Sequence, residues 1–178
     1  DYLIANHILK YHEFPKLGPY NLLYESGLRN SPLYFYVLAL LLIPFNHPVS
    51  LTFFNILFQI GVLVLIYLIV IKIFNPTTAL SAMALYSFSS GVIEQSDYIW
   101  HPYLMQPIAL LSLYFLIKAY VDKNYDPNRS YKFFIASAVT FCMAAAFHLS
   151  VLTWFPVFLI TGIIFLMKTS AVRSGSII

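Results

Sequence analysis

The composition of this 178-residue chain excludes an ordinary water-soluble domain. Hydrophobic residues make up 60% of it and charged residues only 10%, whereas a soluble domain carries roughly 25% charged residues. The formal net charge is only +3 and the basic residues are scattered, so no nucleic-acid-binding patch is predicted.

The first 45 residues are expected to lie outside the membrane core. A short helix over about 2–13 is predicted, followed by a loop rich in Pro and Gly up to residue 30. The segment 31–45 is apolar on all sides, but its continuous run 33–45 would be only about 20 Å long as a helix. The hydrocarbon core is ~30 Å thick, so an interfacial or re-entrant helix is favoured over a span.

Five later segments are predicted to cross the membrane: 51–74, 77–93, 102–121, 133–149 and 151–168. The segment 51–74 is the clearest, and 77–93 is weaker because it is rich in Ser and Ala. The fold class is therefore all-α: a polytopic transmembrane helix bundle with interfacial (juxtamembrane) helices in its first external loop. Residues 1–178 are expected to form a single membrane domain that is cut at both ends.

The basic residues orient these helices. If consecutive spans alternate in direction, one side carries Lys72, Lys118, Lys123, Arg129, Lys132, Lys168 and Arg173. Between the same helices the other side has no Lys or Arg and carries Glu94, Asp97, His101 and His148. The basic side is therefore predicted to be cytoplasmic. Residues 1–30 then face outward if 31–45 does not span, and inward if it does.

The loop 94–102 holds the densest group of reactive side chains. It combines the carboxylates of Glu94 and Asp97 with the imidazole of His101 and the indole of Trp100. Carboxylates and imidazoles take up protons or bind metals near neutral pH, although a solvated loop that keeps helix ends in water is the simpler interpretation. His148 is a further polar group at a predicted helix end. No pair of residues has zinc-site spacing, so a metal site remains unknown.

In this order, the elements resemble the GT-C membrane glycosyltransferases. The nearest branch contains protein O-mannosyltransferases, bacterial aminoarabinose transferases and rhizobial lipopolysaccharide glycosyltransferase-like domains. The resemblance begins with an acid-led helix from Asp1 to Phe14 and Leu17-Gly18-Pro19. It continues with NSPLYFY at 30–36, similar to a Pro-Leu-Tyr-Tyr-Tyr segment, DYIWHP at 97–102, similar to a second external loop, and Phe147-His148-Leu149.

The resemblance implies transfer of a sugar from a polyprenyl-phosphate-linked donor at the outer face of the plasma membrane. It implies an inverting hexosyl- or pentosyl-transferase acting on a lipid, glycan or protein acceptor, in contact with membrane lipid and without nucleic acid. The catalytic residues would be Asp1, Asp97 and His101, and the substrate-binding residues Glu94, Trp100, Arg29 and His148. Family spacing places the principal acid either at Asp1 or about four residues upstream. No cofactor is certain, and a divalent metal is left open.

Two other functions compete with the transferase. A transporter or flippase of lipid-linked glycans would be expected to have charged or broken helices at the bilayer midplane. Between the predicted span ends only Asn55 and Gln59 are clearly polar, which disfavours this function. A non-catalytic membrane subunit would be favoured by external loops without acids, but these loops contain acids.

Overall fold

The computed structural model describes all residues except 20–28, 98–100, 123–126 and 176–178. The described residues form helices and no strand, which confirms an all-α membrane helix bundle. In chain order the helices are α1 (Tyr2–Tyr11), α2 (Leu33–Leu42), α3 (Pro48–Ile73), α4 (Pro76–Ser87), α5 (Ser90–Asp97), α6 (His101–Asp122), α7 (Pro127–Phe147), the 3₁₀ helix η2 (Leu149–Trp154) and α8 (Phe155–Gly175).

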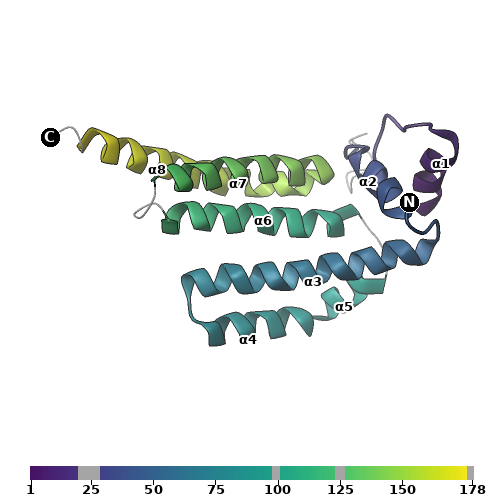
Figure 1. Cartoon of the computed structure of the whole chain (residues 1–178), viewed down its shortest axis with the longest axis horizontal. Helices are drawn as coiled ribbons and strands as arrows, with labels where there is room; N and C mark the ends of the chain where they lie inside the picture. The colour runs from purple at the N-terminus through teal and green to yellow at the C-terminus, as the bar shows by residue number, and fades with distance from the viewer. Residues whose placement is uncertain (20–28, 98–100, 123–126, 176–178) are drawn as a thin grey trace.

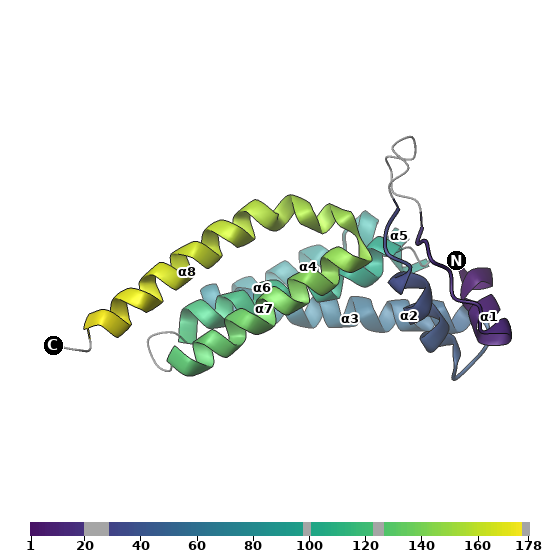
Figure 2. The same cartoon turned by 90° about the horizontal axis from the view of Figure 1, so that it is seen from above.

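The long helices lie roughly parallel to one axis and alternate in direction (Figures 1 and 2). Within the described part of the chain, three stretches are long and apolar enough to cross a membrane: Pro48–Ile73, Tyr103–Val121 and Asn128–Phe147. Large apolar side chains stand exposed along α3, among them Phe53, Ile60 and Val64. An exposed apolar helix surface of this kind suits contact with lipid.

The starts of α3 and α4 are set by local sequence. The His47 Nδ1 accepts a hydrogen bond from the Val49 backbone N–H at the start of α3, and the Asn75 Oδ1 accepts one from Thr78 N–H at the start of α4. A proline follows each capping residue. Proline suits this first helical position because its missing N–H would have no partner there. The chain therefore ends one helix and begins the next within a few residues.

The predicted span 77–93 is divided between two helices. Helix α4 ends at Ser87, Phe88 departs from helical geometry, and α5 begins at Ser90. The Ser87 hydroxyl donates to the carbonyl of Met83, a local bond that competes with continuation of a helix. With 12 residues, α4 is only about 18 Å long. The predicted span 151–168 likewise begins in η2, so the count of five spans remains a prediction.

Helices α6 and α7 are joined along a seam of small residues. The Ser112 hydroxyl donates to the carbonyl of Ser137, and the Ser137 hydroxyl donates to the carbonyl of Ser112, over 2.9 and 2.7 Å. Small side chains let two helix backbones approach closely in a membrane, and hydroxyls can bond across the contact. This seam holds α6 and α7 together along the middle of the bundle.

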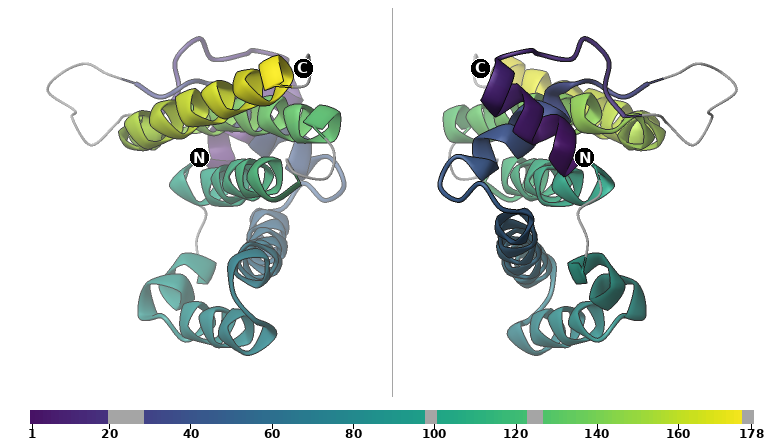
Figure 3. Two further views of the ribbon diagram at one scale, coloured as in Figure 1. Left: turned by 90° about the vertical axis from the view of Figure 1, so that its left-hand side faces the viewer. Right: turned by 90° about the vertical axis from the view of Figure 1, so that its right-hand side faces the viewer.

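Helices α1 and α2 cover one end of the bundle, which we call the capped end (Figures 1 and 3). With 10 residues, α2 is about 15 Å long. A buried apolar cluster joins α1 and α2 to the starts of α3 and α6 and to the end of α7; its members are Ala5, Ile8, Tyr34, Phe35, Leu38, Ala39, Leu42, Leu51, Leu104 and Phe147. Helices α1 and α2 are thus packed where α3 and α6 begin and α7 ends.

Candidate functional site

The candidate residues that the structure describes gather at the capped end. Asp1 precedes α1, Glu94 is exposed on α5, and His148 joins α7 to η2. Asp97 is the last residue of α5 and His101 the first of α6, so their backbones belong to the same end. The side chains of Asp97 and His101, and the whole of Trp100, lie outside the described residues. Their roles therefore stay predictions.

Asp1 is held by a tyrosine from the next helix. The Tyr34 hydroxyl donates to the Asp1 Oδ2 over 3.0 Å. Tyr34 is fully buried in α2, and this burial raises its pKa above the ordinary value. The phenol is therefore a neutral donor throughout the physiological pH range, and it orients the Asp1 carboxylate.

The NSPLYFY segment ties the first loop to the rest of the capped end. The Asn30 Oδ1 accepts from the Leu149 N–H over 3.2 Å. The Ser31 hydroxyl accepts from the Leu33 N–H and caps the start of α2. The Tyr36 hydroxyl donates to a carbonyl in the loop that follows α1, over 2.7 Å. Three residues of the segment that carries the family resemblance thus make hydrogen bonds that hold the first loop and α2 in place.

Gly18 lets two parts of the first loop come together. A Cβ at this position would lie 2.2 Å from the Asn30 carbonyl oxygen and 2.3 Å from that of Ser31. The Asn30 N–H donates to the Pro19 carbonyl over 3.0 Å. The base of the loop is therefore closed, and it places the half-buried Arg29 beside the buried Asn30.

His148 is buried, with 5% of its surface exposed. Its Nδ1 accepts from the Ser150 N–H over 3.1 Å, so the proton of the neutral ring is on Nε2. Burial lowers the pKa of His148. At neutral pH it is an uncharged N–H donor rather than a cation.

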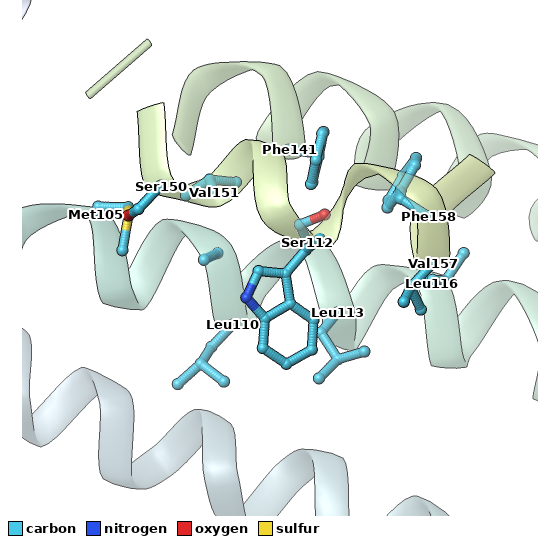
Figure 4. A pocket seen from close by; sticks show the side chains of 12 residues that line it. Met105, Leu110, Ser112, Leu113, Leu116, Phe141, Ser150, Val151, Val157 and Phe158 are labelled. Atoms are coloured by element: carbon cyan, nitrogen blue, oxygen red, sulfur yellow. The ribbon is translucent and has the colours of Figure 1, made fainter. Parts of the chain in front are cut away.

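An apolar cavity of about 200 Å³ lies between α6, α7, η2 and α8. Figure 4 shows Leu113, Phe141 and Phe158 among the side chains around it. Ser150 also lines this space, and its hydroxyl lies 2.6 Å from the Nδ1 of His148. The cavity therefore adjoins the polar group at the end of α7.

A metal site is not assembled by the side chains that are described. Among them, no three His, Cys, Asp or Glu residues lie close enough to hold an ion. The side chains of Asp97 and His101 fall outside that set. Binding of a divalent metal therefore stays open, as it was from the sequence.

A family model, dolichyl-phosphate-mannose-protein mannosyltransferase, matches residues 2–176. The chain belongs to this family. No curated protein and no solved structure matches it. The match confirms the resemblance to GT-C enzymes: this mannosyltransferase-family chain belongs to integral membrane glycosyltransferases that use a polyprenyl-phosphate sugar donor.

Two residues of this mannosyltransferase-family chain had no assigned role from sequence. The sequence singled out Tyr34 and Asn30 only as members of the segment 30–36, which resembles a family motif. Their partners, Asp1 and Leu149, lie 33 and 119 positions away in the chain. No local pattern predicts such pairings, because they depend on how the first loop packs against the bundle.

Proposed function

We propose that this chain supplies catalytic and substrate-binding groups of an enzyme that moves a sugar from a polyprenyl-phosphate carrier to an acceptor at the external face of the plasma membrane. The observation that carries the proposal is that Asp1, Glu94 and His148 belong to one end of the bundle. Family membership supplies the class of reaction. We further propose a hexosyl- or pentosyl-transfer with inversion at the sugar carbon.

The charge distribution supports an external capped end. Lys72, Lys118, Arg129 and Lys132 belong to the helix ends opposite α1 and α2. The Lys118 Nζ lies 4.3 Å from the centre of the Phe133 ring. Basic residues next to membrane spans favour the cytoplasmic side, so the acids and His148 would face outward.

The proposed chemistry is a single displacement. The acceptor hydroxyl loses its proton to Asp1, or to an acid about four residues upstream, while its oxygen bonds to the sugar carbon. The bond between that carbon and the carrier's phosphate oxygen breaks, and the lipid phosphate leaves with the bonding electrons. Arg29 and protonated His101 would stabilise its negative charge. Asp97 would be the second carboxylate of the site, and Glu94, Trp100 and His148 would contact the substrates.

The apolar cavity supports a lipid donor. It lies among membrane helices and adjoins Ser150, which contacts His148. A donor with its phosphate near the capped end could place isoprene units of its chain in this space. Burial of that chain would contribute about 25 cal/mol per Å² of apolar surface.

Substitution in the complete protein tests the proposal. D1N, D97A and H101A should each reduce sugar transfer from a polyprenyl-phosphate donor by at least about 100-fold, without loss of protein from the membrane. The matched control is E13Q, because Glu13 is an exposed carboxylate of the first loop that pairs with His7 over 2.9 Å. Wild-type transfer by both D97A and H101A would overturn the proposed site. Transport of intact donor without transfer would instead support a flippase.

A further inference from the structure

Asn30 joins two parts of the capped end that are distant in sequence. It is buried, with 3% of its surface exposed. Its side-chain oxygen accepts the Leu149 N–H over 3.2 Å, across 119 positions. Leu149 is the first residue of η2, so this N–H has no carbonyl partner within that helix. The amide of Asn30 therefore caps η2 from the first loop.

The same residue is fixed on its other side by the loop. Its backbone N–H donates to the Pro19 carbonyl, and its carbonyl lies against Gly18. Four residues further on, Tyr34 bonds Asp1. On the η2 side, Leu149 follows directly after His148. Two hydrogen bonds, linked by the helix start from Asn30 to Tyr34, thus connect the proposed base with the residue next to the buried histidine.

We propose that Asn30 is a positioning residue that sets the first loop, with Arg29 and Asp1, against the turn that carries His148. This inference rests on the proposed function. The side-chain oxygen of Asn30 is the group that makes the positioning hydrogen bond, because the Asn30 Nδ2 is buried without an acceptor among the described residues. Displacement of reacting groups by about 1 Å can cost 100-fold in rate. The inference therefore predicts an effect on kcat that exceeds the effect on folding.

The hydrogen bond can be removed from either partner in the complete protein. N30A removes the acceptor, and L149P removes the donor. Proline suits position 149 because it is the first helical residue and His148 before it is extended, with φ −153° and ψ 124°. L149A is the control that shortens the side chain but keeps the N–H. N46A is the control for asparagine, because Asn46 makes an exposed hydrogen bond to Asn6 over 3.2 Å.

The rescue variant is N30D, which keeps an acceptor oxygen at the same position. We expect N30A and L149P each to lower kcat about 30-fold, while KM for the donor changes less than about threefold. N30D, L149A and N46A should stay within about fivefold of the wild-type kcat. The N30A/L149P double variant should be no worse than either single variant, because both remove the same bond.

Several results would overturn the inference. Wild-type kcat in both N30A and L149P would do so, as would equal losses in L149A and L149P or failure of N30D to recover activity. A loss that only tracks the fraction of folded protein, followed by thermal unfolding in detergent, would show a purely structural role. If N30A does not accumulate, L149P against L149A decides the question. The D97A and H101A variants separate this inference from the proposed function, since wild-type transfer by both would overturn the proposed site whatever the effect of N30A.

Discussion

The Tyr34 hydroxyl donates a hydrogen bond to the Asp1 Oδ2 over 3.0 Å, joining two residues 33 positions apart. The bond crosses from the start of α1 to the first turn of α2. Because Tyr34 is fully buried, packing fixes its ring, and its hydroxyl is held beside the carboxylate. A tyrosine of α2 thus orients the proposed base, which precedes α1.

Y34F should reduce sugar transfer about tenfold, because the ring stays in place while the Asp1 carboxylate loses its donor. The measurement is kcat for transfer in purified membranes, with protein quantified by immunoblot. Y36F is the matched control, because the Tyr36 hydroxyl donates to a loop carbonyl, that of Pro15, over 2.7 Å. Equal losses in Y34F and Y36F would mean that the loop as a whole, rather than the orientation of Asp1, sets the rate.

Acid should destabilise the protein through His148. Burial lowers the pKa of His148 in the folded state below its ordinary value near 6.5. Below that value the unfolded chain binds the proton more readily, so the free energy of unfolding falls as pH decreases and is unaffected above it. H148N retains an acceptor for the Ser150 N–H and should remove this contribution.

Thermal unfolding in detergent at pH 7.5 and pH 5 measures the effect. The unfolding temperature of the wild type should fall more between the two pH values than that of H148N. H47N is the control, because His47 is exposed and its Nδ1 likewise accepts a backbone N–H, that of Val49. An H148N variant that is as acid-sensitive as the wild type would exclude His148 as the cause.

Filling the apolar cavity should weaken binding of a long-chain donor. A109F would project an aromatic ring into the space of about 200 Å³ that Ala109 lines. We expect KM for a long polyprenyl donor to rise at least about fivefold, with a smaller change for a short-chain analogue. A146F, at an exposed position of α7, should change neither value. Identical effects on both donors would show that the chain does not occupy the cavity.

Gly18 and Gly61 should respond in opposite directions to alanine. In G18A the new Cβ would overlap the carbonyl oxygens of Asn30 and Ser31, at 2.2 and 2.3 Å. The overlap should destabilise the fold by about 1–3 kcal/mol or more. At Gly61, inside α3, nothing lies within 4 Å of an added Cβ, and alanine should stabilise the helix by up to about 1 kcal/mol. Thermal unfolding of both variants measures the difference, and a G18A protein as stable as the wild type would contradict the close approach.

The helix that begins at Pro48 could be predicted because its evidence is local. A long apolar run of helical length needs no partner to identify it, and the capping residue and proline at its start act over a few positions. The break at Phe88 could not be predicted because no strong helix-breaking residue marks it. The segment 77–93 contains no proline and no charged side chain, and the hydroxyl of Ser87 bonds back to its own helix.

The sequence by itself determined that this is an all-α membrane protein, because composition and segment length dictate whether a helix can be solvated by lipid. It also indicated the family, through short motifs in a particular order. Only the tertiary structure decided that Tyr34 holds Asp1 and that Asn30 caps η2. Those bonds form when α1 and α2 pack their apolar faces on the ends of α3, α6 and α7. Burial of that cluster, rather than any local preference, brings the polar partners within reach.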